Sequence, residues 1–178
     1  MRWIRVWCWV LAAVAAAAIP QAGSAQAPHE IPPPRAPLHE LAASAVVVVT
    51  GLVEEVGEGR LRLAARAALR GQPPAVFELK RSPLQPPQLA AGDRVLLFLR
   101  GARPPYVLVG EPDEVIRIAS DAEEAAWRAE IPKLLAAGAD PERLRAVYAA
   151  WLAAGPEALR EAAEWSLLGL PRLPRGAS

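Results

Sequence analysis

The chain has 178 residues, of which 20 are basic and 19 acidic, so its formal net charge is only +1 at pH 7. This balance argues against a general nucleic-acid binder, which needs a large positive excess to displace counterions from phosphates. The single cysteine is Cys8, so the chain beyond it has no disulfide, no thiolate nucleophile and no cysteine metal site.

The first 25 residues have the pattern of an export signal. Arg2 and Arg5 give a positive start, residues 6–19 are apolar, and residues 23–25 offer small side chains to a signal peptidase. The alternative is a permanent membrane anchor, but the apolar stretch falls short of the roughly 18 residues that a bilayer core requires. We expect a periplasmic or secreted protein with no stable membrane span after signal cleavage. Without residues 1–25, 18 basic and 19 acidic residues remain, a net charge of −1.

Residues 26–43 are predicted to form a Pro-rich arm. Five prolines between positions 28 and 37 favour extended polyproline conformations. His29 and His39, each followed by glutamate, are the only histidines, and two histidines can in principle share a metal ion. The flanking prolines leave them without preorganised geometry or a third ligand at a diagnostic spacing. We interpret them as solvated residues, and we predict no metal site and no cofactor.

Residues 44–119 are predicted to form a β domain. The run at 46–53 is β-branched and too apolar for a strand with one wet face, so we expect cover on both sides for part of its length. Residues 57–59 predict a tight hairpin loop, after which residues 60–69 alternate as in a strand with one face in solvent. The pattern places further strands at 75–80, 94–100, 106–109 and 114–118. Short strands at this spacing are typical of a small, curled antiparallel barrel or sandwich.

Residues 120–178 have the period of helices. Ser120 and Glu123 have capping-box spacing at a helix start, and Pro132 is expected to kink or split that helix. The pattern places two further helices at about 141–154 and 156–168, where prolines mark the first turns. The predicted fold class is therefore α+β, a small antiparallel β-barrel of five or six strands followed by a bundle of about three helices.

The same patterns predict the core. The side chains expected inside the barrel are Leu61, Leu63, Val95, Leu97, Leu99 and Val107. We expect the helices to pack across the barrel and cover its apolar outer strand, with Trp151 and Leu167 in the contact. Trp127, Trp151 and Trp165 lie at helical spacing, which favours burial over a carbohydrate-binding platform.

Four segments carry a resemblance to a known family: Val49-Thr50-Gly51-Leu52-Val53, Leu69-Arg70-Gly71, Ala91-Gly92-Asp93-Arg94-Val95-Leu96-Leu97-Phe98-Leu99 and Tyr106-Val107-Leu108-Val109-Gly110. With these segments, the stretch from about 40 to 118 resembles an OB-like module of exported bacterial proteins, similar in outline to the tissue inhibitor of metalloproteinases and netrin modules. Those inhibitors coordinate a protease zinc ion through an amino-terminal cysteine, which this chain lacks after its signal. The resemblance therefore implies a fold and does not carry over the inhibitory mechanism.

The tail at 140–170, particularly 156–169, resembles a single HEAT-type helical pair. One pair cannot form a solenoid, because stacked repeats bury each other's faces and about three are needed. Packing against the β domain is the favoured interpretation of this tail.

The candidate binding site is an arginine row along the second predicted strand, made of Arg60, Arg62, Arg66 and Arg70. Side chains two residues apart on a strand are about 6.5 to 7 Å apart, so the row could meet an acidic protein face or a polyanion. The alternative is an ordinary solvated strand face with cross-strand partners such as Glu54 or Glu78.

No pattern of catalytic residues emerges from the sequence. The serines lie in no nucleophile-elbow context, and the glycines form no phosphate-binding loop. Glu54 and Glu55 are adjacent, but neighbours on a strand point to opposite faces and make poor acid–base partners. We expect a non-catalytic binding or scaffold module that acts on another envelope or extracellular protein. The alternative is a carrier of a small ligand or polyanion that uses the arginine row.

Signal cleavage is expected after Ala25, because Gly23 and Ala25 are both small, whereas cleavage after Ala27 would leave Pro28 next to the cut. Mass spectrometry of the exported protein should find a chain that starts at Gln26. Recovery of the intact chain from the membrane fraction would instead indicate the anchor.

Overall fold

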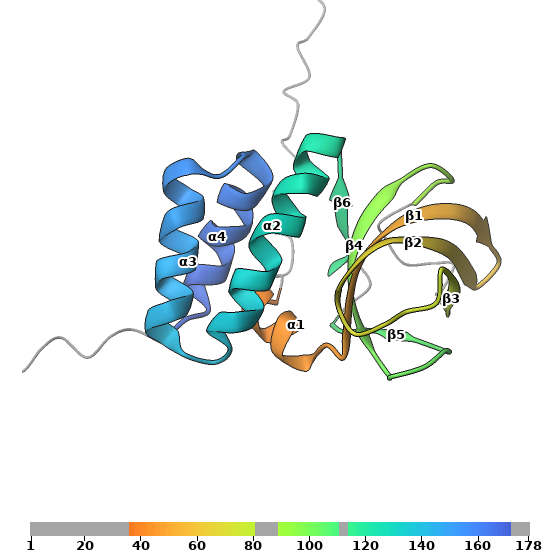
Figure 1. The fold of residues 1–178 in the computed structure, drawn as a ribbon, viewed down its shortest axis with the longest axis horizontal. Coiled ribbons are helices and arrows are strands. Elements are labelled where there is room, and N and C mark those ends of the chain that lie inside the picture. The colour runs from red at the N-terminus through yellow and green to blue at the C-terminus, as the bar shows by residue number, and fades with distance from the viewer. Residues whose placement is uncertain (1–35, 81–88, 111–113, 172–178) are drawn as a thin grey trace, which may run out of the picture. The chain divides into compact units, whose positions relative to one another are not determined.

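The structure, a computed structural model, describes residues 36–80, 89–110 and 114–171, which belong to one compact unit from Pro34 to Ser178. The predicted export signal, His29 and most of the predicted arm lie outside the described residues. The elements in chain order are α1 (Leu38–Ser44), β1 (Val47–Gly57), β2 (Arg60–Arg70), β3 (Val76–Lys80), β4 (Arg94–Arg100), β5 (Val107–Leu108), β6 (Ile116–Ile118), α2 (Asp121–Ala137), α3 (Pro141–Ala154) and α4 (Glu157–Leu168). The predicted α+β fold, with three helices after the strands, is confirmed (Figure 1).

The strands form one antiparallel sheet in the order β3-β2-β1-β4-β5, with β6 paired to β4 (Figure 1). The sheet curls until β3 approaches β5, where Leu79 and Tyr106 form an isolated parallel bridge. Three register shifts in the β1–β2 ladder mark bulges, which bend a strand and increase its twist. The sheet is not closed into the predicted barrel, because a single bridge joins its two ends within the described residues.

The concave side of the sheet holds one of two apolar clusters. Its buried members are Val47, Val49, Val53, Leu61, Leu63, Phe77, Leu79, Leu89, Val95, Leu97, Leu99 and Tyr106. Five of the six side chains predicted inside the barrel are in this cluster. The prediction is wrong for Val107, which is 61 % exposed. Val107 pairs with exposed Arg100, and its neighbours Tyr106 and Leu108 face the cluster instead, because side chains alternate along a strand.

The outer side of the sheet packs against the helices and forms the second cluster, to which Val48, Leu96 and Phe98 belong. The first part of β1, up to Val53, and most of β4 are therefore buried on both faces, as expected for part of the apolar run at 46–53. Val46 marks the limit of this cover, with 48 % of its surface exposed.

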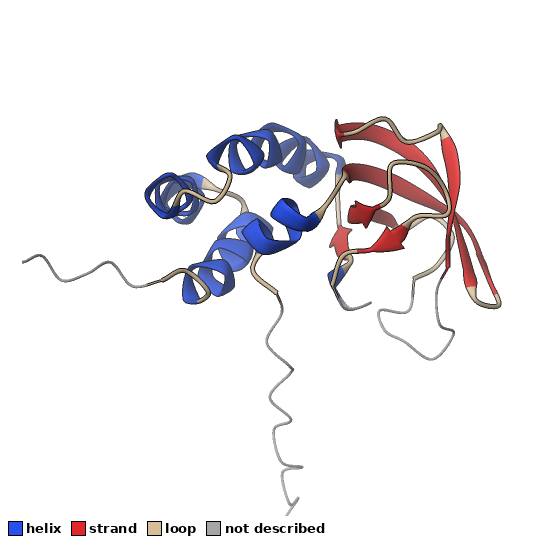
Figure 2. Cartoon of the chain, turned by 90° about the horizontal axis from the view of Figure 1, so that it is seen from below, coloured by secondary structure: helices blue, strands red, loops and turns tan. Residues whose placement is uncertain are grey.

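The helices form two layers beyond the sheet. α1 and α2 contact the strands, and α3 and α4 pack on α1 and α2 (Figures 1 and 2). The sheet is thus covered mainly by α1 and α2, and only indirectly by the predicted pair at 141–154 and 156–168. Trp127 and Trp151 are buried in the helical cluster in edge-to-face contact, with ring centroids 6.1 Å apart. This confirms the predicted burial of these two rings, and Trp165 and Leu167 are partly buried against the same cluster.

Helix α2 begins as predicted. The Ser120 hydroxyl accepts a hydrogen bond from the Glu123 amide at 3.1 Å, and the Glu123 carboxylate accepts one from the Ala119 amide at 2.9 Å. The prediction of a split at Pro132 is wrong, since α2 continues through it. Ile131 and Leu134 on either side of it are buried in the core, and this packing stabilises the helix across the missing backbone donor.

Helix α1 was not expected, because residues 38–43 fall in the predicted Pro-rich arm. Leu38 and Leu41 enter the helical core, and the Leu38 amide donates to Ser166 Oγ at 3.1 Å. The Arg70 guanidinium donates to the carbonyl oxygens of Ala42 and Ala45 at 2.6 and 3.2 Å. Tertiary contacts therefore order a helix of seven residues that would be too short to persist alone.

His39 lies on α1 and is not a solvated linker residue. Its Nδ1 atom is 3.2 Å from the Tyr148 hydroxyl oxygen. Burial lowers the pKa of His39 below its usual value, although the Glu40 carboxylate acts in the opposite direction. Burial also raises the pKa of Tyr148 to about 12, while hydrogen bonding to Ser166 and His39 opposes the change. A neutral His39 beside a protonated Tyr148 is thus the stable state of this contact near pH 7.

The central strand β4 gives a direct test of the core. Leu97 is fully buried, and we expect Leu97→Ala to lower the free energy of unfolding by about 2–5 kcal/mol, because it leaves a cavity in the concave cluster. Val107→Ala is the control, with an expected change within about 0.5 kcal/mol, because Val107 is exposed. Urea denaturation of both variants measures these changes, and equal midpoints would contradict the assigned core.

Candidate functional site

The arginine row begins at the β1–β2 hairpin. Gly57 pairs with Arg60, which leaves a two-residue loop of Glu58 and Gly59. Gly59 has a φ of +70°, a conformation that tight hairpin turns require and that glycine adopts without strain. The hairpin therefore presents Glu58 and Arg60 at one end of the sheet.

The first two arginines of the row have carboxylate partners on neighbouring strands. Arg60 Nη1 lies 3.8 Å from Glu78 Oε2, and Arg62 Nε donates to Glu54 Oε2 at 3.0 Å. Both pairs are substantially exposed, and exposed ion pairs contribute little to stability. These are the cross-strand partners that the sequence offered as the alternative to a recognition surface.

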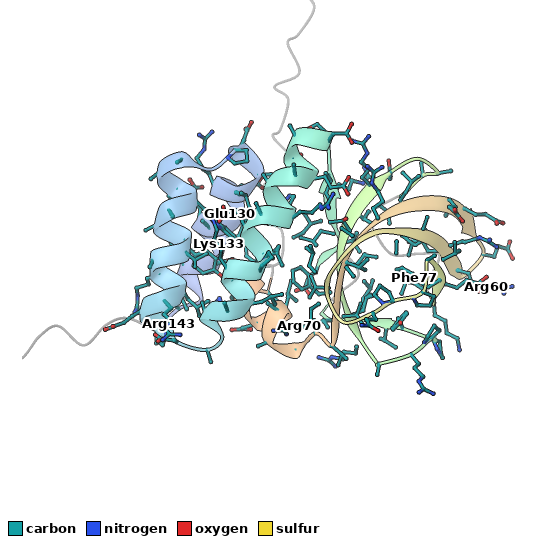
Figure 3. All side chains as sticks on the ribbon, viewed as in Figure 1. Arg60, Arg70, Phe77, Glu130, Lys133 and Arg143 are labelled. Atoms are coloured by element: carbon teal, nitrogen blue, oxygen red, sulfur yellow. The ribbon has the colours of Figure 1, made fainter. Side chains whose placement is uncertain are left out.

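The last two arginines of the row face the helices. Arg66 is the extra residue of a bulge opposite Thr50 and Gly51, and Arg70 follows another register shift. Figure 3 shows the resulting separation, with Arg60 at the far end of the sheet and Arg70 beside α1. The bulges break the period of two on which a single row depends, so the structure does not bring the four arginines together on one surface.

Arg66 reaches a buried carboxylate on α2. Its Nε lies 3.1 Å from Glu124 Oε1 and 3.0 Å from Oε2, and the Thr50 hydroxyl donates to Oε1 at 3.0 Å. Glu124 is only 3 % exposed. Asp121 Oδ1, one turn earlier on α2, lies 3.5 Å from Arg66 and 3.0 Å from Arg94. This ion cluster joins β1, β2 and β4 to the start of α2, and its function is structural.

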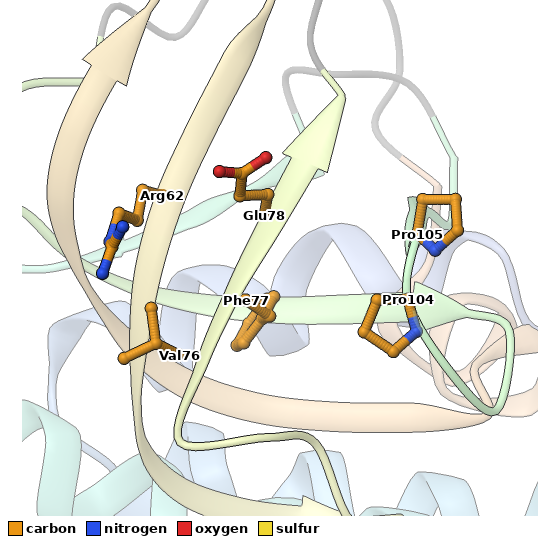
Figure 4. Close-up of a pocket in the computed structure, with 6 residues that line it drawn as sticks. All are labelled: Arg62, Val76, Phe77, Glu78, Pro104 and Pro105. Carbon is orange, nitrogen blue, oxygen red and sulfur yellow. The ribbon is translucent and has the colours of Figure 1, made fainter.

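A depression lies beside β3, where the curled sheet is open. It has a volume of about 630 Å³ and is lined by Arg62, Val76, Phe77, Glu78, Pro104 and Pro105 (Figure 4). Val76, Phe77 and the two prolines make its lining mainly apolar. We call it the β3 depression.

A second depression adjoins the first. Its volume is about 400 Å³, and its lining consists of Glu55, Gly57, Glu58, Arg60, Arg62 and Glu78. We call it the hairpin depression. The two depressions share Arg62 and Glu78, so an apolar surface continues into a charged one.

The hairpin depression is slightly acidic. Among the described residues, three glutamates line it against two arginines, and Glu54 already binds Arg62 from outside it. Among the described residues, Glu55 and Glu58 have no ion-pair partner. This surface therefore suits a ligand with positive charge better than a polyanion.

Among the described residues, those that line these depressions include no serine, cysteine or histidine. Within residues 36–80, 89–110 and 114–171, no group of three or more histidine, cysteine, aspartate or glutamate side chains is arranged to hold a metal ion. No helix in the same described part of the chain is long and apolar enough to cross a membrane. What the arrangement offers chemically is apolar contact and charge.

Sequence reasoning identified Arg60 and Arg62 but missed the apolar part of the site. Val76 and Phe77 were predicted only as residues of the strand at 75–80, and Pro104 and Pro105 lie between two predicted strands. Two sequence signals could have pointed to it: the alternation of the strand at 76–80 and the consecutive prolines Pro104 and Pro105, which lie far apart in the chain. The pairing of these two segments depends on the curl of the sheet, which no local pattern specifies.

Comparisons with known proteins add no assignment, since no protein-family model matches the chain and no curated protein matches its sequence.

Two arginines of the same strand provide a matched test of the ion cluster. Arg66→Met leaves Glu124 buried without its cation and should lower the free energy of unfolding by roughly 2 kcal/mol or more. Arg62→Met removes an exposed pair and should change it by less than about 1 kcal/mol. Chemical denaturation measures both, and an Arg66→Met variant as stable as Arg62→Met would refute a structural role for the cluster.

Proposed function

We propose that this chain is an exported, non-catalytic binding module that acts on another protein of the cell envelope. The observation that carries the proposal is the β3 depression, an apolar surface beside Val76 and Phe77 that is bordered by Arg62 and Glu78. An apolar surface with a charged border is typical of protein–protein contact.

We also propose that the β domain is OB-like, as its resemblance implies. The strand order supports this, because β3 meets β5 after β2, β1 and β4 have completed the curl. OB-folds bind ligands on the face of strands 2 and 3 and at the loops that join strands 1–2 and 4–5. Glu58, Val76 and Pro104 occupy these places, one in each loop and one on β3.

The alternative, a carrier of a small ligand or polyanion, has less support. It requires the arginine row to present its positive charge to the ligand. Arg60, Arg62 and Arg66 each face a carboxylate, and Arg70 donates to backbone carbonyls. Positive charge that is compensated within the protein attracts a polyanion only weakly.

Site-specific cross-linking tests the proposal. A photoreactive amino acid at Val76, in the full chain expressed with its signal in the source cells, should cross-link one defined envelope protein. The same group at exposed Glu161 on α4 is the control and should not cross-link that protein. Identical products from both positions, or none from Val76, would contradict the proposed site. A higher affinity of the purified chain for heparin than for the cross-linked protein would favour the carrier.

A further inference from the structure

We infer that the free edge of β3 binds an extended segment of the partner protein by strand addition, and that this segment carries an apolar residue directly next to a lysine or arginine in sequence. The inference rests on the proposed function, which states that the β3 depression is the binding surface. It adds the conformation of the bound segment and the chemistry of its side chains.

The hydrogen bonds of β3 leave part of its backbone directed away from the sheet. The Ala65 amide donates to the Ala75 carbonyl at 2.8 Å, and the register then pairs Leu63 with Phe77. Because bonded and non-bonded pairs alternate in an antiparallel ladder, the N–H and C=O of Val76 point to the free edge. Outside the β2–β3 ladder, no backbone hydrogen bond between described residues uses these groups. An unpaired strand edge of this kind is a template for another strand.

The residues that line the β3 depression place it at the edge of the strand and not over one face. Val76 and Glu78 are exposed, whereas Phe77 between them is buried in the concave cluster, so the lining includes both sides of β3. In the view of Figure 4, Pro104 and Pro105 lie on one side of β3 and Arg62 on the other. A segment bound here would run along the strand between β3 and the two prolines. The bridge at Leu79 occupies the edge beyond Glu78, so the added segment is short.

The two sides of this edge differ in chemistry. The segment would meet Phe77 of the concave cluster and the neighbouring Pro104 and Pro105, which favour an apolar side chain. On the exposed side, it would meet Glu78 and the hairpin depression, where Glu55 and Glu58 favour a cation. Successive side chains of a strand point to opposite faces, so the apolar residue and the basic residue must be adjacent in sequence.

Two synthetic peptides of the same composition test this inference, by fluorescence anisotropy with the purified full chain. The first, acetyl-Ser-Thr-Lys-Leu-Lys-Thr-Ser-amide, places each lysine next to leucine. The second, acetyl-Ser-Lys-Thr-Leu-Thr-Lys-Ser-amide, places all three on one face of a strand. We expect the first to bind at least tenfold more tightly than the second. In an antiparallel arrangement the residue that bonds to the Val76 backbone places its side chain on the same exposed face as Val76, so this residue is a lysine, and N-methylation of both lysine amides should weaken the first peptide by a similar factor.

Variants of the protein provide the controls. Glu55→Gln combined with Glu58→Gln should weaken the first peptide several-fold, whereas Glu157→Gln combined with Glu161→Gln, on exposed positions of α4, should leave it unchanged. Circular dichroism checks that each variant remains folded.

Equal affinity of the two peptides, no effect of N-methylation, or no binding of the first peptide would overturn strand addition. The cross-linking experiment separates this failure from that of the proposed function. A partner that cross-links at Val76 while the peptides fail would leave the binding surface in place and refute only its strand-like occupant.

Discussion

The fold depends on the burial of apolar side chains on both faces of the β1–β4 pair. Val47, Val49 and their neighbours on β4 point to one side, and Val48, Leu96 and Phe98 point to the other. Each fully buried side chain of this kind contributes about 1.5–3 kcal/mol. A sheet this small cannot bury two faces by itself, so it curls over one face, and α1 and α2 cover the other.

The arginines of β2 follow from the same constraint. Polar groups that are buried between a helical layer and a sheet must find hydrogen-bond or ion-pair partners there, because an unpaired buried polar group is costly. Arg66 compensates Glu124 at the start of α2, and Arg70 donates to two carbonyl oxygens at the C-terminal end of α1, those of Ala42 and Ala45. The bulges that turn these side chains toward the helices also separate them from Arg60 and Arg62.

The candidate site is a consequence of incomplete closure. Bulges curl the sheet until β3 and β5 approach, but a single bridge between Leu79 and Tyr106 leaves the edge of β3 available beside Pro104 and Pro105. Exposed strand edges are normally protected, because they invite non-specific association. Here charged residues next to the edge, among them Glu78 and Arg62, provide such protection. In the proposed function the same charges would also select the bound segment.

The sequence by itself determined the elements that depend on local chemistry: the hairpin at Gly59, the cap at Ser120, the helices after Asp140 and Pro156, and the alternation that buries Leu61 and Leu97. These follow from short-range periodicity and from the conformations that single residues allow. Only the tertiary structure decided that Val107 faces solvent, that residues 38–44 form a helix, and that the arginine row divides between two surfaces. The helix needs partners distant in sequence, and a bulge reverses a strand's alternation without a reliable sequence signal. The apolar part of the candidate site belongs to the same class, because Val76 and Pro104 meet only when the sheet curls.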